Sequence, residues 1–264
     1  MTSPPAAAPA ARPPKPMSAW RLEWLRMTRT PRAIALGATY LTFGLLGPVT
    51  ARYAQEILNR VEPGVQVIMP APAPKDGIAN YIGQVSQTGL IVVVVITAGA
   101  LAFDARRGLS TFLRTRTSTM WQLIAPRFTF NAAAAVTAYT LGTAAAWYET
   151  ALLLGSPPAG PMVAGLLCGA VYLVFAVATA TAAASVARST LGTIGITLGV
   201  LLALPVLGLA GPLHPWLPST LVTAPVALLD GSALSDYLPA LAIAAASTVL
   251  LLAAATSRFG RREV

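Results

Sequence analysis

The stretch Leu90-Ile-Val-Val-Val-Val-Ile-Thr-Ala-Gly-Ala-Leu-Ala-Phe103-Asp104-Ala-Arg-Arg-Gly108 decides the fold class, because unbroken apolar sequence gives way abruptly to charge. The apolar part closes a run over 81–103, and roughly 20 such residues cross a bilayer as a helix. Lipid offers no partner for open backbone groups, and no segment alternates with the period of a membrane barrel. The stretch therefore predicts an all-α membrane protein.

The composition extends this prediction to the whole chain. Of the 264 residues, 55% are hydrophobic and only 10% are charged, whereas soluble domains carry about 25% charged residues. Such a chain has too little polar surface to face water, and its length allows about six membrane helices. Cys168 is the single cysteine and lies in an apolar run, so neither an intramolecular disulfide nor a cysteine metal site is expected.

Six apolar segments define a predicted six-span transmembrane domain over residues 33–264. They cover residues 33–53, 81–103, 128–154, 162–186, 191–211 and 238–255. The segment 128–154 is the least apolar, because it is rich in alanine and threonine. The Pro/Ala-rich residues 1–16 have no apolar core and are predicted to be a disordered cytoplasmic tail, not a signal peptide.

The positive charges predict the orientation of the spans. With both termini in the cytoplasm, all of the 18 lysine and arginine residues except Arg52, Arg60 and Lys75 lie inside, as the positive-inside rule requires. An odd number of spans would spoil this asymmetry. The net charge of +9 is spread between apolar runs and not gathered in basic blocks, so it indicates membrane orientation and no nucleic-acid partner.

Residues 17–32 are predicted to form an amphipathic interfacial helix before the first span. At 100° per residue, Trp20 and Trp24 fall on one side, and Glu23, Arg26 and Arg29 fall on the other. Tryptophan rings at headgroup depth with arginines toward phosphate are typical of a helix that lies on membrane lipid. The alternative is a charge cluster beside the membrane in which the tryptophans are incidental.

Two outer segments are longer than a simple connection requires. Residues 54–80 are rich in proline. Residues 212–237 contain Trp216 and Pro218, followed by a moderately apolar stretch that is too short to span and that Pro225 is expected to break. This second segment is predicted to be a re-entrant hairpin before the last span.

The side chains that carry catalysis or bind metal are scarce. The only lysines, Lys15 and Lys75, do not follow a glycine-rich phosphate loop, and the single histidine, His214, excludes His-pair metal motifs. The predicted midplanes of the spans hold no ionisable residue, which weakens an ion-coupled mechanism. We therefore expect a non-catalytic chain with no catalytic residue, metal or cofactor of its own.

The basic, hydroxyl-rich loop 104–127 between the second and third spans is suited to binding a soluble partner on the cytoplasmic side. The candidate partner-binding residues are Asp104, Arg106, Arg107, Gly108, Thr111, Phe112, Leu113, Arg114, Arg116, Thr117 and Ser118.

The order of these elements resembles the membrane subunits of type-2 ATP-binding-cassette exporters. That family has an interfacial helix, six spans, a coupling helix between spans two and three, and a hairpin before span six. Asp104 stands where the family commonly has Glu, Gly108 follows at the matching spacing, and Phe112-Leu113 matches a Leu pair. Arg116 departs from a common Pro, and Pro126-Arg127 replaces a usual Lys.

The resemblance implies a permease in the plasma membrane of a bacterium that pairs with a second permease copy or paralogue. It also implies a cytoplasmic ATPase subunit that binds ATP and magnesium and drives export of a hydrophobic, lipid-linked or peptide-like substrate. Two other functions stay open on the residues alone. They are a membrane scaffold or assembly factor without transport, and an ion-coupled carrier or small channel.

Overall fold

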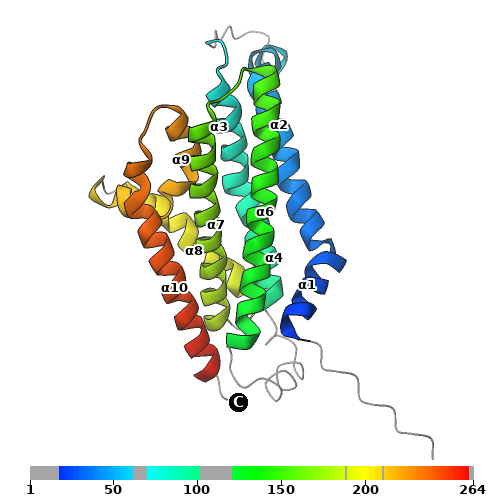
Figure 1. Ribbon diagram of the computed structural model, residues 1–264, viewed down its shortest axis with the longest axis vertical. Coiled ribbons are helices and arrows are strands. Elements are labelled where there is room, and N and C mark those ends of the chain that lie inside the picture. Colours follow the sequence, from blue (N-terminus) through cyan, green and yellow to red (C-terminus); the bar gives the residue numbers. More distant parts are fainter. Residues whose placement is uncertain (1–17, 62–69, 102–120, 188, 210, 262–264) are drawn as a thin grey trace, which may run out of the picture.

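The computed structural model describes residues 18–61, 70–101, 121–187, 189–209 and 211–261. Within these ranges every regular element is a helix, and the long helices stand side by side in one bundle (Figure 1). The elements are α1 (Ala19–Arg29), α2 (Pro31–Val61), α3 (Pro74–Gln84), the π-helical η1 (Val85–Gly89), α4 (Leu90–Leu101), α6 (Trp121–Leu153), α7 (Ala159–Val186), α8 (Thr190–Gly208), η3 (Gly211–Trp216), α9 (Thr220–Leu229), η4 (Leu234–Tyr237) and α10 (Leu238–Arg261).

Five helical stretches of the described chain are long and apolar enough to cross a membrane. They are Pro31–Arg60, Pro74–Leu101, Ala159–Val186, Thr190–Gly208 and Leu234–Gly260. Large apolar side chains on their outer faces are exposed, among them Leu202 at 64%, Val206 at 64% and Leu250 at 68%. Side chains of this kind face lipid in a membrane, so the prediction of an all-helical, multi-pass membrane protein is confirmed.

The helices extend beyond the apolar runs seen in the sequence. Helix α2 continues to Val61, and the next helix begins at Pro74, inside the predicted outer segment 54–80. Proline is favoured in the first turn of a helix, and the Asp76 carboxylate accepts a hydrogen bond from the Ala73 N–H at 2.8 Å. Helix α6 likewise begins at Trp121, within the range predicted for the loop.

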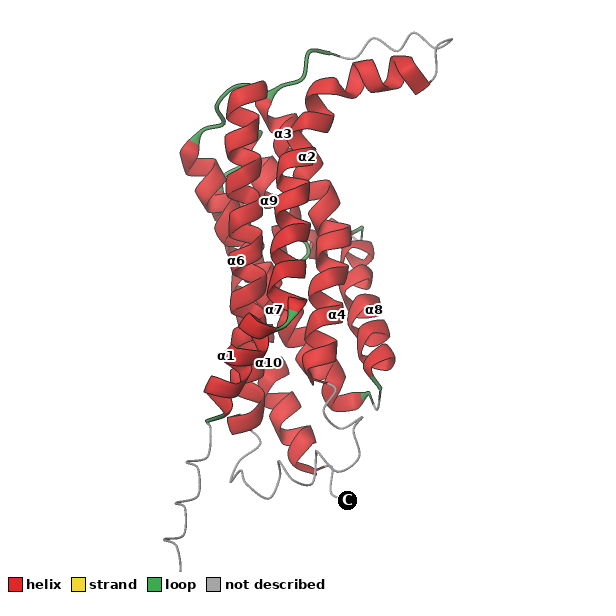
Figure 2. Ribbon diagram, turned by 90° about the vertical axis from the view of Figure 1, so that its right-hand side faces the viewer, coloured by secondary structure: helices red, strands yellow, loops and turns green. Residues whose placement is uncertain are grey.

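At one end of the bundle lie α1, the C-terminal ends of α4, α7 and α10, and the start of α6 (Figure 1). Arg29 of α1, Arg127 of α6 and Arg258 of α10 all belong to this end. Arg52 and Lys75 lie toward the opposite end, where the last turns of α2 bend away from the bundle (Figure 2). The described lysine and arginine residues therefore lie toward both ends of the bundle, and more of them belong to the α1 end.

Candidate functional site

Helix α1 is shorter than the predicted interfacial helix. The Ser18 hydroxyl caps its start by accepting from the Arg21 N–H at 3.3 Å, and Thr30 ends it in an extended conformation. Pro31 then opens α2, because proline fits the first turn of a helix but interrupts one that is already running. The range 17–32 thus holds a helix of 11 residues and the beginning of the first span.

The two tryptophans of α1 lie partly on α6. The Trp20 and Trp24 side chains are 49% and 56% exposed, and each ring lies 5.9 Å from the Phe130 ring, measured between centroids. Arg29 is exposed and the Arg26 side chain is 42% exposed. Half-exposed indoles beside exposed arginines are typical of a helix at a membrane surface, and Phe130 fixes that helix to the bundle.

Glu23 does not lie on the exposed polar face that was predicted for it. It is 5% exposed and packs toward α6, where its Oε1 accepts from Arg127 Nε at 3.1 Å and from Arg26 Nη1 at 3.0 Å. The prediction for Glu23 was wrong because it followed the charge of the residue, although a spacing of three residues from Trp20 and four from Met27 puts Glu23 on the apolar side of α1. Burial of a charge is tolerated where it is paired.

Arg127 is the residue of this site whose buried contact the sequence did not predict. Its side chain is 2% exposed, although it follows a basic loop whose other arginines suggest a solvated position. Asn131, one turn further along α6, donates from Nδ2 to the Arg127 carbonyl at 2.7 Å. The sequence shows Arg127 only as a basic residue at the start of an apolar segment, which does not indicate its partner.

The predicted partner-binding residues lie outside the described ranges. They are Asp104, Arg106, Arg107, Gly108, Thr111, Phe112, Leu113, Arg114, Arg116, Thr117 and Ser118. The helices that flank them, α4 and α6, are described. The last residues of α4 and the first residues of α6 both lie at the end of the bundle where α1 lies.

The outer hairpin residues lie apart from this end. Trp216 ends η3 and is 54% exposed, while Pro218 is buried before α9. Pro225 does not break the helix as expected, because α9 runs through it from Thr220 to Leu229. Its ring fits against Gly165 of α7, so the short apolar helix is held by packing beside α7 (Figure 1).

A cluster of buried tyrosines occupies the middle of the bundle and was not predicted. Tyr81 of α3 stacks on Tyr139 of α6 with ring centroids 6.5 Å apart, and Tyr40 of α2 meets Tyr139 edge-on at 6.1 Å. The Tyr81 hydroxyl is 3.2 Å from Thr143 Oγ1 and 3.3 Å from the Tyr139 carbonyl. These rings come from three separate helices, so no local pattern in the sequence marks them.

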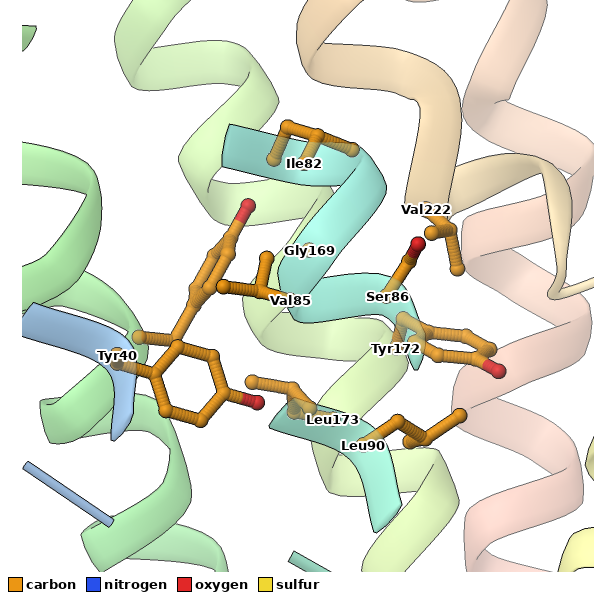
Figure 3. A pocket seen from close by; sticks show the side chains of 10 residues that line it. Tyr40, Ile82, Val85, Ser86, Leu90, Gly169, Tyr172, Leu173 and Val222 are labelled. Carbon is orange, nitrogen blue, oxygen red and sulfur yellow. The ribbon is translucent and has the colours of Figure 1, made fainter. Parts of the chain in front are cut away.

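A small cavity opens beside this cluster, next to the π-helical turn η1 (Figure 3). Its volume is about 30 Å³, which holds about two water molecules. Tyr40, Val85, Leu90 and Tyr172 give it a mainly apolar lining. A drug-sized molecule needs several hundred Å³, so this cavity does not accommodate one.

The described residues offer little chemistry beyond packing. No group of three or more His, Cys, Asp or Glu residues in the described ranges could hold a metal ion. Glu23 and Arg127 are the charged side chains that are buried among the residues described. The arrangement can therefore position helices and present a surface, and the buried ion pair is its most specific feature.

We expect Tyr81→Phe to lower the free energy of unfolding by about 0.6–1.7 kcal/mol, from the average to the maximum that double-mutant cycles gave for hydrogen bonds in one membrane protein. The change removes the hydroxyl that lies against Thr143 and the Tyr139 carbonyl. Urea unfolding in mixed micelles would measure the effect. Tyr53→Phe, at a ring that is 41% exposed, is the control and should leave the midpoint unchanged.

No family model matches the chain, and no curated protein or solved structure matches it either.

Proposed function

We propose that the chain is the membrane permease subunit of an ATP-binding-cassette exporter. A separate ATPase subunit would drive it to move a hydrophobic, lipid-linked or peptide-like substrate out of the cytoplasm. The observation that carries this proposal is the convergence of α1 and the two helices flanking residues 104–118 at one end of the bundle. A soluble partner that binds the basic segment there also reaches α1.

The proposal includes six spans with both termini in the cytoplasm. In this proposal helix α6 is the third span, although it is less apolar than the five stretches that are long and apolar enough to cross a membrane. Its 33 residues extend about 50 Å at 1.5 Å per residue, which exceeds a hydrocarbon core of about 30 Å. Its buried face, which includes Ala135, Gly142 and Ala146, packs against neighbouring helices, so this span needs less apolar surface than a lipid-exposed one.

Single cysteines in a Cys168→Ala background test this topology. Cysteines at Ser118 and Arg261 should be shielded from an impermeant thiol reagent in intact cells, because both positions are proposed to be cytoplasmic. A cysteine at the exposed Ser232, between α9 and η4, should be labelled. Labelling at Ser118 from outside the cell would contradict the six-span arrangement.

The charge distribution supports an external energy source. Within the described ranges the buried charged side chains are Glu23 and Arg127, which belong to the α1 end of the bundle. Proton- and sodium-coupled carriers commonly place ionisable groups near the membrane midplane. Energy supplied by ATP hydrolysis in a partner chain requires no such group.

The proposal is tested by reconstituting the chain in lipid vesicles with a candidate ATP-binding-cassette ATPase subunit. The two chains should co-purify, and vesicles holding both should move a hydrophobic fluorescent dye only with ATP and magnesium. Transport should be lost when the partner's phosphate-binding lysine is replaced, and it should survive collapse of proton and sodium gradients. If the chain alone accumulated dye from an ion gradient, it would be an ion-coupled carrier. If the chain bound the ATPase but moved no dye, it would be a membrane scaffold.

Leu113→Asp should lower co-purification of the ATPase at least about tenfold, because an apolar anchor in a partner's groove accounts for about 1.4 kcal/mol or more. Quantitative blotting after affinity purification measures this ratio. Ser110→Asp adds the same charge to the same segment without removing an apolar side chain, and it should retain the ATPase. Equal retention by both variants would show that Leu113 is no anchor.

A further inference from the structure

Helix α1 is joined to α2 by one residue that belongs to neither helix. Thr30 has φ −110° and ψ 158°, and its hydroxyl donates to the Arg26 carbonyl at 2.6 Å, which closes α1. Pro31 then starts α2. Because the hydrogen-bond ladders of both helices end at this junction, side-chain contacts must set the angle of α1 to the bundle.

Those contacts are made with α6. Trp20, Glu23, Trp24 and Met27 follow the spacing that places side chains on one face of a helix. The tryptophan rings meet Phe130 at 5.9 Å, while Met27 is 9% exposed. Glu23 thus lies at the centre of a contact that is otherwise apolar.

The ion pairs of Glu23 differ in what they connect. Arg26 Nη1 is 3.0 Å from Glu23 Oε1, but both residues belong to α1, and the Arg26 side chain is 42% exposed. Arg127 Nε is 3.1 Å from the same oxygen and joins α1 to α6, and both of these side chains are at most 6% exposed. Removing one partner of a buried pair leaves an uncompensated charge, so the Arg127 contact resists separation of the two helices.

Arg127 is well placed to transmit a displacement. It follows the first residue of α6, Trp121, by less than two helical turns, and α6 begins directly after the basic segment. Pro126 leaves one backbone hydrogen bond of this stretch unmade, but the other bonds of the first turns join Trp121 to Arg127, so a push on the start of α6 displaces Arg127. The ion pair passes that displacement to Glu23 and hence to α1.

We propose that Glu23 and Arg127 form a latch that makes α1 and the first turns of α6 move as one unit. This inference rests on the proposed function, because the motion it carries is the one that an ATPase would impose. Both residues are positioning residues, since neither is placed in contact with substrate or nucleotide. The latch delivers the motion to the Thr30 junction and so to the first span.

Accessibility of a cysteine at Met27 tests the latch without a partner chain. In a Cys168→Ala background this cysteine should react slowly with a maleimide in detergent micelles, since Met27 is buried. Glu23→Gln and Arg127→Gln should each speed the reaction about tenfold by releasing α1. Arg26→Gln is the matched control, because it removes a contact to the same oxygen within α1 and should leave the rate unchanged. The double change Glu23→Leu with Arg127→Leu should restore shielding, because it removes both buried charges together.

A second measurement separates a latch from a purely structural contact. In vesicles with the ATPase, Glu23→Gln and Arg127→Gln should keep ATP hydrolysis but lose dye transport about tenfold, a typical coupling between two sites. The latch is overturned if the cysteine at Met27 stays shielded in both single variants. It is also overturned if that cysteine reacts while transport remains at the parental rate. If the parental pair shows no ATP-dependent transport, the proposed function itself fails.

Discussion

Gly44→Ile should prevent α2 and α6 from packing and should reduce the yield of folded protein to near zero. A Cβ atom at Gly44 would collide with the backbone carbonyl of Gly142, and a Cβ atom at Gly142 would lie 2.6 Å from the Tyr40 carbonyl oxygen. Backbone atoms cannot rotate away, so the helices must separate. Overpacking costs about 1–3 kcal/mol even where side chains can adjust, and small residues are what allow membrane helices to approach closely.

Gly37→Ile in the same helix is the matched control. A Cβ atom at Gly37 meets no other atom within 4 Å, so this variant should reach parental levels. Fluorescence-detected size exclusion of a tagged protein measures the folded fraction, and thermal unfolding measures any residual stability. A Gly44→Ile protein that elutes and melts like the parent would refute the close contact between α2 and α6.

Gly165→Leu should displace α9 from α7 and lower Tm by about 10 °C, the shift expected for a loss of about 3 kcal/mol in a chain of this size. A Cβ atom at Gly165 would lie 2.5 Å from the Pro225 Cα and 2.9 Å from its Cβ. Proline has no flexible side chain that can give way. Helix α9 must therefore shift, and Leu221, which is fully buried in the parent, should become accessible.

A cysteine at Leu221 in the Cys168→Ala background reports this displacement by its rate of maleimide labelling. Gly160→Leu is the control in the same helix, because a Cβ atom there meets nothing within 4 Å. Labelling should rise in Gly165→Leu and remain slow in Gly160→Leu. An unchanged rate in both variants would mean that α9 is not held against α7 through Gly165.

The salt bridge between Lys75 and Asp230 contributes less to the hairpin than this packing. The Lys75 Nζ is 2.8 Å from Asp230 Oδ1, but both side chains are about half exposed. Water and salt screen such pairs, so they add little stability. The segment around α9 is therefore held mainly by apolar contact.

The positions of the helices along the chain were predictable where hydropathy alone determines them. The runs 162–186 and 191–211 agree closely with α7 and α8, because lipid requires an uninterrupted apolar surface over a fixed length. Agreement is poorer where a helix leaves the hydrocarbon region. Helix α2 extends to Val61 and α3 begins at Pro74, since polar residues and an N-terminal proline are accepted at helix ends.

Side-chain contacts between distant segments could not be predicted. Pro225 suggested a broken helix, yet Gly165 on another helix provides space for its ring. Tyr40, Tyr81 and Tyr139 gather only when α2, α3 and α6 pack together. No local periodicity carries such information, because each helix holds only one member of the contact.

The sequence by itself determined the helical membrane class, most of the long helices and the separation of positive charge along the chain. These follow from the cost of placing open backbone and charge in hydrocarbon, which depends on each segment alone. Only the tertiary structure decided that Glu23 is buried against Arg127, which lies 104 positions further along the chain. That contact depends on the angle and register between α1 and α6, and these are set by packing across the bundle.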